Sequence, residues 1–418
     1  MPLKIEDLTG PVEEKIQRSK AGFEIEKATR LTAANPQGEK IGFVDVVMEG
    51  GGVNGITTAG AIYAMERLGF RFRKIAGTSA GAICAALLVA AGEDALDMKS
   101  TTLTKILSNM DFYSFVDGGA DARALLKSYN NPGSGTFFKE FLQTMRKGIS
   151  LIRNVNDLVG ELGINPGNEF KAFITDKMES LNDHMPFTVA ALQDKLTRHI
   201  QSLEADYQIP GTFTGQDFAA DFQVVVSDVS FQRKAVFPRD TVRYFKNPDN
   251  ILVGDFVRAS MSIPIFFEPF RLIDFTTGEA NLKASGHIAF VDGGLVSNFP
   301  LSLFDVKGKP RCPTFGLLID ELKGKQPEPN KVDNLFELGM AMFETTREYG
   351  DKAYVAENPS AAARIIRMSN TGVQGKKIGT TDFDIADGDK IQLFKNGVQA
   401  VLEKMSEWDF EKYIRKFR

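Results

Sequence analysis

Apolar residues along the chain fall into short runs that alternate with helical stretches. Residues 42–48 (Gly-Phe-Val-Asp-Val-Val-Met) have the length and character of a strand buried on both faces, and a glycine cluster follows them. Residues 56–68 carry apolar positions at helical spacing and stop before Gly69. A short second strand at residues 74–76 precedes another apolar helix at residues 80–91. This alternation predicts an α/β fold with a parallel sheet wrapped by helices, and with ligands at the carboxyl ends of the strands.

More strand candidates lie farther along the chain, so the sheet is expected to draw on both halves of the sequence. They are residues 222–229, 234–237, 288–291, 314–319 and 364–368. Between about residues 100 and 220, the pattern changes to amphipathic helical stretches separated by Pro-Gly turns. This segment is interpreted as a helical insertion that could cap the ligand-binding edge as a lid.

The same patterns suggest the domain boundaries. Residues 1–40 are charged, contain prolines and show weak helical periodicity, so we predict an N-terminal extension. The main domain is predicted to span residues 41–402, including the insertion. Residues 403–418 form a predicted C-terminal tail.

Length and charge narrow the classes of protein. With 418 residues, of which 43% are hydrophobic, the chain can bury the core of a large domain. The formal net charge of −4 and the sequence pI of about 5.7 give no general attraction for nucleic acid or for an anionic membrane surface. We therefore expect no nucleic-acid partner, and any contact with lipid is expected to use local patches.

Cysteine usage and the N-terminus bear on the compartment. Cys84 and Cys312 each sit in an apolar segment, so a reducing compartment without a disulfide framework is expected. The first residues include acids and lack an apolar core of signal-peptide length, which argues against Sec-type export. The nearly uncharged run at residues 75–92 is interrupted by glycines, so it is interpreted as strand, turn and helix rather than a membrane span. The predicted location is cytoplasmic or peripheral to a membrane, with any export by a non-Sec route.

The first motif that carries chemistry is a glycine-rich loop directly between the first strand and the first helix. Residues 49–55 read Glu-Gly-Gly-Gly-Val-Asn-Gly, a G-x-G-x-x-G pattern that ends at Gly55. Glycines let the backbone turn sharply and expose its N–H groups, and the following helix adds positive potential, so an anion is favoured there. By itself the loop is also compatible with a structural turn, or with a dinucleotide site if the next strand ended in an acidic residue. That strand ends instead in a serine motif.

The second motif is Gly77-Thr78-Ser79-Ala80-Gly81, a G-x-S-x-G pattern between a strand and a helix. In a nucleophile elbow of this kind, the small Gly77 and Gly81 permit a strained turn that projects the Ser79 hydroxyl from the sheet edge. One right-handed crossover makes the two strands neighbours. The loop amides can then hold the oxyanion that forms when Ser79 attacks a carbonyl. The candidate oxyanion hole consists of Gly50, Gly51, Gly52 and Val53.

The third motif is Asp292-Gly293-Gly294, in which a strand delivers an aspartate at its end and two glycines keep the surroundings open. A serine hydroxyl is nearly un-ionised at neutral pH, so it needs a base within hydrogen-bond reach. An aspartate of ordinary pKa is a poor base, and partial desolvation should raise the pKa of Asp292. Asp292 is therefore the candidate base, although this motif alone is also compatible with an ordinary turn.

A histidine base is the main alternative mechanism. The chain has His184, His199 and His287; the first two lie in the predicted insertion, and His287 precedes Asp292 by about one strand length. We therefore do not expect a catalytic histidine. No spacing of His, Cys or carboxylates suggests a metal site, so neither a metal nor another cofactor is predicted.

Taken together and in this order, the three motifs resemble the patatin-like phospholipase family. Residues 258–264 (Arg-Ala-Ser-Met-Ser-Ile-Pro) and residues 298–300 (Asn-Phe-Pro) resemble the family's segments before and after its catalytic aspartate, and a closing strand and helix fit near residues 383–402. The resemblance implies a three-layer sandwich with a mostly parallel central sheet flanked by helices. It also implies a Ser-Asp dyad of Ser79 and Asp292 and an oxyanion hole in the glycine loop.

The loop departs from the family pattern at two positions. Many members carry aspartate where Glu49 stands and a basic residue where Asn54 stands. Without that positive charge, the loop is expected to stabilise an oxyanion or a phosphate headgroup less strongly. Long insertions and an N-terminal extension also resemble bacterial phospholipase effectors that need an activating protein partner.

Two other groups of residues have open roles. The basic residues Arg71, Arg73, Lys74, Lys376 and Lys377 either contact lipid phosphates or form a solvated face. Most of the 33 phenylalanines must be core, but some in the insertion could line an acyl groove or dip into a lipid surface. Those candidates are Phe112, Phe115, Phe137, Phe138 and Phe141.

The leading hypothesis is a phospholipase A or lysophospholipase that docks on membranes and cleaves acyl esters of glycerophospholipids. Esterase chemistry follows from the motifs, whereas the phospholipid substrate is implied by the resemblance. The alternative from another class is a binding module on the same fold, which captures a membrane or a protein with little catalysis, or an effector that a partner activates. A thioester-dependent acyltransferase is a weaker third option, because such enzymes usually show a catalytic histidine.

Overall fold

The computed structural model describes residues 3–93, 97–118, 162–272, 287–319, 332, 335–379, 382 and 385–418. Its strands are β1 (Thr32–Ala34), β2 (Lys40–Met48), β3 (Phe70–Thr78), β4 (Gly163–Asn165), β5 (Asp221–Asp228), β6 (Arg233–Phe237), β7 (Ile265–Phe267), β8 (Phe270–Leu272), β9 (Ile288–Asp292), β10 (Thr314–Ile319) and β11 (Ile365–Met368). The strands expected from the apolar runs are therefore present, and β3 is longer than expected because its first half alternates between buried and half-buried side chains.

Helices account for most of the remaining described chain. They are α1 (Ile5–Ala21), α2 (Ile25–Ala28), α3 (Gly55–Arg67), α4 (Ala80–Ala90), α5 (Ser100–Ser108), α9 (Asn168–Ser180), α10 (Val189–Asp206), α11 (Thr241–Tyr244), α12 (Val253–Ser260), α13 (Gly294–Ser297), α14 (Leu335–Glu357), α15 (Pro359–Ala362), α16 (Asp387–Glu407) and α17 (Phe410–Phe417). Short 3-10 helices are η1 (Gly52–Asn54), η2 (Phe112–Phe115), η3 (Gly215–Phe218), η4 (Pro248–Asn250), η5 (Leu301–Phe304) and η6 (Val373–Gly375).

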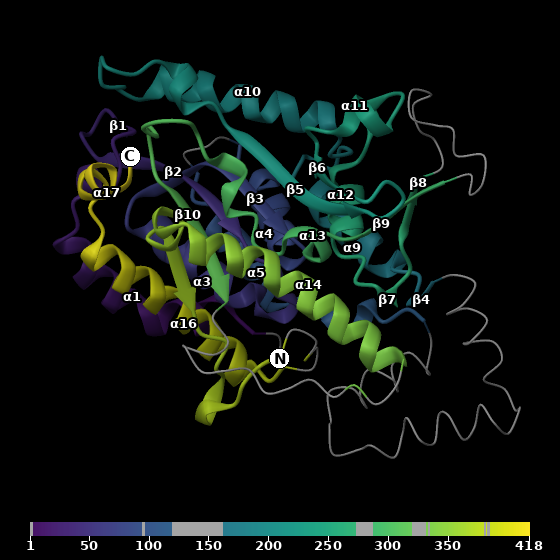
Figure 1. Cartoon of the computed structure of the whole chain (residues 1–418). Coiled ribbons are helices and arrows are strands. Elements are labelled where there is room, and N and C mark those ends of the chain that lie inside the picture. Colours follow the sequence, from purple (N-terminus) through teal and green to yellow (C-terminus); the bar gives the residue numbers. More distant parts are fainter. Residues whose placement is uncertain are drawn as a thin grey trace, which may run out of the picture.

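The described strands build a nine-stranded mixed sheet with the order β11-β10-β2-β3-β5-β9-β8, in which β1 pairs with β2 and β6 with β5. The five strands from β11 to β5 run parallel, whereas β9 runs antiparallel to β5 and β8 antiparallel to β9. Helices cover both faces of this sheet (Figure 1). The predicted α/β class, with a mostly parallel sheet between helices, is confirmed. The expected neighbours β2 and β3 are indeed paired.

The central strand β2 shows why the sheet is covered on both sides. Val44, Val46 and Met48 face the main core, together with α3, α4 and α16. Phe43 belongs to a second cluster with residues of α10 and η3, and Val47 to a third with residues of η5 and α15. Since successive side chains of a strand point to opposite faces, a continuously apolar strand requires helices on both faces.

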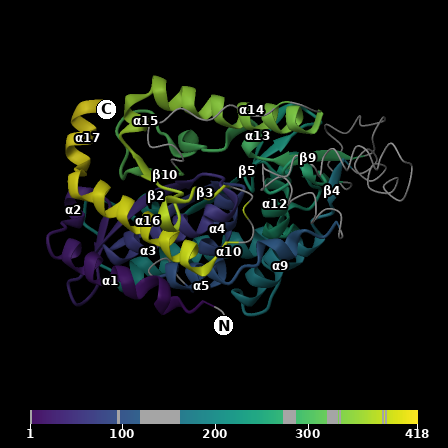
Figure 2. The same ribbon diagram turned by 90° about the horizontal axis from the view of Figure 1, so that it is seen from below.

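The N-terminal residues, predicted to be an extension, pack closely on the main domain. Leu8, Val12 and Ile16 of α1 are buried in the main core, and β1 adds an antiparallel strand to β2. The Trp408 indole N–H donates to the carbonyl of Ala28 at 2.9 Å, so residues near the two ends of the chain are in contact. Figure 2 shows α1, α2, α16 and α17 on the same side of the molecule. Helix α16 ends at Glu407, five residues beyond the predicted helix, because Met405 is still buried.

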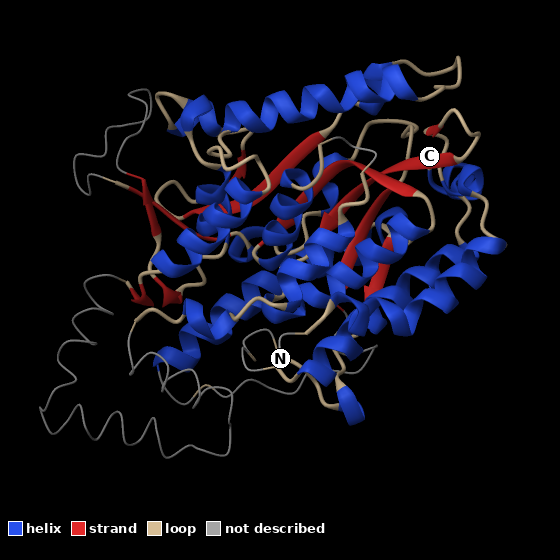
Figure 3. Ribbon diagram, turned by 180° about the vertical axis from the view of Figure 1, so that it is seen from behind, coloured by secondary structure: helices blue, strands red, loops and turns tan. Residues whose placement is uncertain are grey.

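Helix α10 lies across the amino-terminal ends of the strands (Figure 3). Its residues Lys195 and His199 line a small cavity with Phe72, Arg73 and Asp221, which stand near the starts of β3 and β5. The His199 ring also lies 6.2 Å from the ring of Phe43, near the start of β2. This part of the predicted insertion therefore covers the end of the sheet opposite to Ser79. Residues 119–161 of the predicted lid lie outside the described residues.

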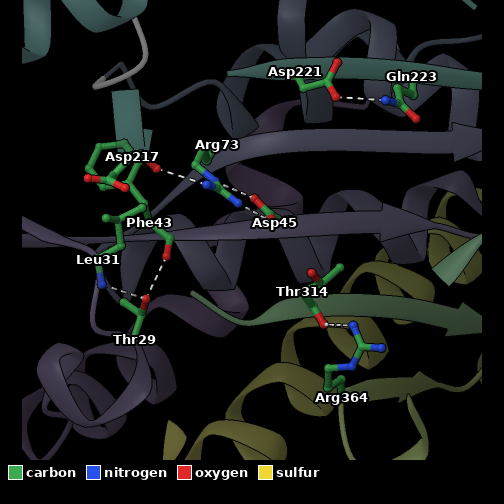
Figure 4. Close-up of polar contacts among 10 residues, drawn as sticks. All are labelled: Thr29, Leu31, Phe43, Asp45, Arg73, Asp217, Asp221, Gln223, Thr314 and Arg364. Atoms are coloured by element: carbon green, nitrogen blue, oxygen red, sulfur yellow. Dashed lines mark hydrogen bonds and ion pairs between the residues drawn. The ribbon is translucent and has the colours of Figure 1, made fainter. Parts of the chain in front are cut away.

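Buried polar contacts hold the same amino-terminal end together (Figure 4). The Arg73 guanidinium on β3 donates to both carboxylate oxygens of Asp45 on β2, at 2.8 and 2.7 Å, and to the carbonyl of Asp217 at 2.9 Å. The Asp45 side chain is only 3% exposed. A paired, two-point contact of this kind compensates for the desolvation of both charges. Arg73 is therefore paired with Asp45 inside the sheet, which favours a structural role over contact with lipid phosphate.

Candidate active site

Ser79 stands on a strained turn between β3 and α4. Its backbone angles are φ 53° and ψ −123°, a conformation that a residue with a side chain rarely adopts. The turn brings three backbones together: a Cβ on Gly77 would lie 2.1 Å from the Gly81 carbonyl oxygen, and one on Gly81 would lie 2.3 Å from that of Met48. Only glycine fits these two positions. The expected geometry of a nucleophile elbow is therefore present, with Ser79 6% exposed.

Asp292 reaches Ser79 from two strands away. Thr78 on β3 pairs with Val225 on β5, and the next residue of β5, Val226, pairs with Asp292 at the end of β9. Ser79 and Asp292 therefore stand at nearly the same level of the sheet. Because β9 runs antiparallel, this meeting does not follow from the carboxyl ends of parallel strands, as the motif order had suggested. It follows from β5 extending beyond β3 so that β9 can run back along it.

The Ser79 hydroxyl has two acceptors within reach. In this structure its Oγ donates to the Met261 sulfur at 3.3 Å. It also lies close enough to Asp292 for hydrogen bonding to lower the pKa of that carboxyl. Asp292 Oδ1 accepts the Gly294 amide at 2.7 Å, while the buried Oδ2 accepts no hydrogen bond from the described residues. One carboxyl oxygen is thus fixed and the other is open.

Burial raises the pKa of Asp292 to about 6. The Ser79 hydroxyl, the Gly294 amide and the Arg347 guanidinium oppose this shift, and the Glu344 carboxylate adds to it. The desolvation expected for Asp292 is confirmed, since its side chain sits in a 2% exposed position. A carboxylate with this pKa is ionised at neutral pH and is a stronger base than an exposed aspartate.

The glycine loop lies directly against the serine. A Cβ on Gly50 would lie 2.9 Å from the Ser79 Cβ. The Gly50 amide donates to the Asn298 carbonyl at 3.1 Å, so it is not free for a substrate. The amides of Gly52 and Val53 belong to the first turn of η1, where N–H groups have no partner within the helix. With the neighbouring amide of Gly51, they are the donors that the loop can offer to an oxyanion.

The residues beside the loop hold its shape. Asn54 is buried, and its side-chain amide donates to the Gly51 carbonyl at 3.2 Å, so this position stiffens the loop without adding charge. The Asn298 side-chain amide donates to the Gly50 carbonyl and to Glu49 Oε1, both at 3.1 Å. The helix that follows the loop, α3, begins at Gly55. Asn298 therefore ties the glycine loop to the segment that follows Asp292.

Glu49 connects the loop to the next strand of the sheet. Its Oε2 accepts the Ile319 amide at 2.6 Å at the end of β10. Burial raises the pKa of Glu49 to about 8, against the Arg347 guanidinium and the Ile319 amide, which favour the ionised form. Glu49 is therefore a bracing group with a titration in the neutral range, a role that the sequence pattern did not suggest.

Residues 260–262, which the motifs did not place in the site, contact both Ser79 and Asp292. The Ser79 amide donates to Ser260 Oγ at 2.8 Å, and the Ser260 hydroxyl donates to the Val225 carbonyl at 2.7 Å. The backbone of the same segment accepts the Asp292 amide, at the Ser262 carbonyl, at 2.8 Å. The only sequence signal was the family resemblance of residues 258–264.

The two glycines after Asp292 have separate roles. A Cβ on Gly293 would lie 2.1 Å from the Val225 carbonyl oxygen, so this glycine lets the chain pass close to β5. The Gly294 amide binds Asp292 Oδ1, and α13 starts at this residue. Both glycines of the third motif therefore shape the surroundings of the carboxyl.

None of the three histidines joins this site. His199 lies on the buried face of α10, where burial lowers its pKa to about 3. His287 precedes β9 at the end opposite to Asp292, and His184 is exposed in the turn between α9 and α10. Among the described residues, no group of three or more His, Cys, Asp or Glu side chains is arranged to hold a metal ion. Cys84 and Cys312 are both buried and unpaired.

The remaining candidates are mostly engaged in internal contacts. Phe112 and Phe115 are buried, and the Phe115 ring packs 5.3 Å from that of Phe170; the other three phenylalanines lie outside the described residues. The Lys74 ammonium lies 5.7 Å from the centre of the Phe304 ring, and Lys376 is 3.9 Å from the Asp389 carboxylate. Among the helices that the structure describes, none has the length and apolar character needed to cross a membrane.

A serine on a strained elbow, a buried carboxyl of raised pKa and a row of glycine amides are the groups that acyl hydrolysis through a serine requires. The comparisons identify the family. Residues 46–305 match the family described as patatin-like phospholipase, and because the match covers more than half of the chain, the chain belongs to that family. At the family level it is a lipid acyl hydrolase.

Individual relatives are more distant. The uncharacterized protein YqhO of Bacillus subtilis (strain 168) is 27% identical over 368 residues, which cover 88% of this chain and 100% of that protein. The crystal structure of VipD from Legionella pneumophila is 14% identical, covers 91% of this chain and 71% of its own, and gives a TM-score of 0.43. The structure of the ExoU–SpcU complex from the type III secretion system of Pseudomonas aeruginosa is 16% identical. The match covers 89% of this chain and 52% of the chain in that complex, with a TM-score of 0.37.

Proposed function

We propose that the protein cleaves acyl esters of glycerophospholipids as a phospholipase A or lysophospholipase, with Ser79 as nucleophile and Asp292 as base. The observation that carries this proposal is the open Oδ2 of the buried Asp292 beside the Ser79 hydroxyl. The family membership supports the lipid substrate.

The reaction follows from these groups. As the bond from Ser79 Oγ to the acyl carbon forms, the hydroxyl proton passes to Asp292 Oδ2, and the carbonyl oxygen becomes an oxyanion. Collapse of this intermediate breaks the ester bond, and the leaving alkoxide takes the proton from Asp292. Water then attacks the acyl-serine with Asp292 again as base, which releases the fatty acid and restores Ser79.

The oxyanion is placed against the amides of Gly51, Gly52 and Val53. Removing one such donor in well-studied hydrolases costs about 3–4 kcal/mol of transition-state stabilisation. The start of α3 behind the loop adds the positive end of a helix dipole. Because Asn54 carries no charge, the loop stabilises the oxyanion through its backbone N–H groups.

Activity on defined lipids tests this proposal. Vesicles of phosphatidylcholine with different acyl chains at the two positions, and micelles of lysophosphatidylcholine, are incubated with wild type, Ser79→Ala and Asp292→Asn, and products are identified by mass spectrometry. We expect fatty acid release by wild type and a loss of several orders of magnitude in both variants, with unfolding midpoints close to wild type. Unchanged hydrolysis in Asp292→Asn would refute the dyad.

A partner-activated enzyme or a binding module with little catalysis is the second candidate. It is favoured by the bond from Ser79 Oγ to Met261, which engages the hydroxyl with a group other than the base, and by the uncharged loop. A fluorophosphonate probe separates the possibilities. Labelling of the pure wild type, but not of Ser79→Ala, supports an autonomous enzyme, and labelling only after addition of a cell lysate supports activation by a partner. No labelling under any lipid or lysate condition supports the binding module.

A further inference from the structure

Arg347 of α14 is a mostly buried cation beside the turn that follows the candidate base. Its side chain is only 10% exposed, although arginine is seldom buried unless it is paired. The Arg347 Cδ lies 3.4 Å from the place where a Cβ on Gly294 would stand, and the Gly294 amide in turn binds Asp292 Oδ1. Helix α14 packs along α13, which begins just after Asp292 (Figure 1). The side chain is thus held against the backbone that orients the carboxyl.

A second contact of α14 fixes this placement. Asp351 lies one helical turn after Arg347, on the same face of the helix. Its carboxylate accepts the Ser297 hydroxyl at 3.1 Å and the Phe299 amide at 2.5 Å. Both donors belong to the segment that continues from Asp292. Helix α14 therefore contacts the segment after Asp292 at two places, through Arg347 and through Asp351. The Arg347 contact is the one nearer to the candidate base.

The charges that act most strongly on Arg347, among the described residues, are acidic. On its own helix, Glu344 lies 3.5 Å and Glu348 3.9 Å from the guanidinium. From the site, the carboxyls of Asp292 and Glu49 act on it through their charge; Asp292 ends β9, and Glu49 directly follows β2. The Nε of Arg347 is buried and makes no hydrogen bond with the described residues. The guanidinium therefore serves as one charge shared among several carboxyls rather than as half of a single ion pair.

We infer that Arg347 is a positioning residue for the reaction: from α14 it packs against the Gly294 turn that holds the Asp292 carboxyl and brings positive charge to it, while Glu344 brings negative charge. This inference rests on the proposed role of Asp292 as base. The signs of the interactions agree, because Arg347 lowers the pKa of Asp292 and Glu344 raises it. Asn54 adds no charge to the glycine loop, so Arg347 brings positive charge to the site from a helix outside all three motifs.

Arg347 and Glu344 carry opposite charges on the same helix, so their replacement should shift the Asp292 titration in opposite directions. Arg347→Met removes the cation, so the Asp292 titration should move to higher pH, by about one unit for a neighbouring opposite charge. Glu344→Gln removes an anion and should move the same titration to lower pH. Arg347→Lys keeps the charge and should restore most of the wild-type value. Glu357→Gln is the matched control, because this exposed glutamate makes the same change at the C-terminal end of α14, more than three helical turns beyond Glu344, and we expect no shift.

Two measurements apply to each variant. The first is NMR titration of aspartate labelled with carbon-13 at the carboxyl, with the Asp292 signal assigned through Asp292→Asn. The second is the pH dependence of kcat/KM on an uncharged ester. A role limited to packing would give no shift, or shifts of the same sign in Arg347→Met and Glu344→Gln, and either result overturns the inference.

The design also separates this inference from the proposed function. If the wild type shows no hydrolysis and no probe labelling, the proposed function fails, and the NMR titration still decides whether Arg347 controls the ionisation of Asp292. If Arg347→Met does not fold, Arg347→Lys and Glu344→Gln carry the test. In that case an unshifted Asp292 signal in Glu344→Gln overturns the inference.

Discussion

The backbone amide of Ser79 donates a 2.8 Å hydrogen bond to the hydroxyl of Ser260, a residue 181 positions later in the chain. The same hydroxyl donates to the Val225 carbonyl on β5, so a single side chain connects the elbow to the neighbouring strand. The strained conformation of Ser79 is therefore supported by a contact that neither the elbow motif nor its glycines provide.

Replacing Ser260 by alanine should loosen the elbow. The change leaves the Ser79 amide and the Val225 carbonyl unpaired in a buried place, so we expect a loss of about 1–3 kcal/mol in the free energy of unfolding. We also expect a fall of about tenfold in kcat, which corresponds to roughly 1.4 kcal/mol of transition-state energy. Denaturant unfolding and ester hydrolysis measure the two effects. The control is Ser202→Ala on α10, where the hydroxyl bonds only within its helix and the expected change is within about 0.5 kcal/mol.

The activity should depend on the ionisation of Asp292. The base works only when it is deprotonated, so kcat/KM should rise with pH, with a midpoint near the Asp292 pKa of about 6, and should level off above it. Below the midpoint the rate should fall tenfold per pH unit. Rates on an uncharged ester between pH 4 and 9 test this. A midpoint near the ordinary value for aspartate would show that burial does not control the base.

Glu49 should make the free energy of unfolding depend on pH in the neutral range. Its pKa is raised in the folded state, so its stabilising contribution is complete below the ordinary value near 4.5 and is lost as the pH rises through about 8. Glu49→Gln removes this titration at the cost of a hydrogen-bond acceptor for either Ile319 or Asn298. We therefore expect the variant to be less stable than wild type at pH 5 and to lose much of that deficit by pH 9. A difference that stays constant with pH would contradict the raised pKa.

The contact between α3 and α16 should tolerate no side chain at Gly397. A Cβ there would lie 1.9 Å from the Thr57 carbonyl oxygen and 2.8 Å from the Ala61 nitrogen, both in the backbone of α3. Gly397→Ala should therefore force the helices apart and cost about 1–3 kcal/mol or more. Gly350→Ala in α14 is the matched control, because it faces open space and should stabilise its helix by about 0.5–1 kcal/mol. Thermal unfolding of the two variants distinguishes these outcomes.

Much of the fold could be predicted from local patterns. A strand buried on both faces must be apolar at nearly every position, which made β2, β5 and β10 visible in the sequence. The motifs at residues 49–55 and 77–81 fall at the joins between a strand and a helix, where glycine is demanded by close backbone contacts. Such requirements act over a few residues, so they leave a direct trace in the sequence.

The sequence by itself determined the class of fold, the elbow at Ser79, and Asp292 as the carboxyl to be placed beside it. Only the tertiary structure decided that β9 runs antiparallel, that α10 covers the opposite end of the sheet, and that Ser260, Asn298 and Arg347 surround the pair. The reason is physical: strand direction and charge environment depend on packing between segments far apart in the chain, such as Glu49 and Ile319, which are separated by 270 positions. No local spacing rule specifies those contacts.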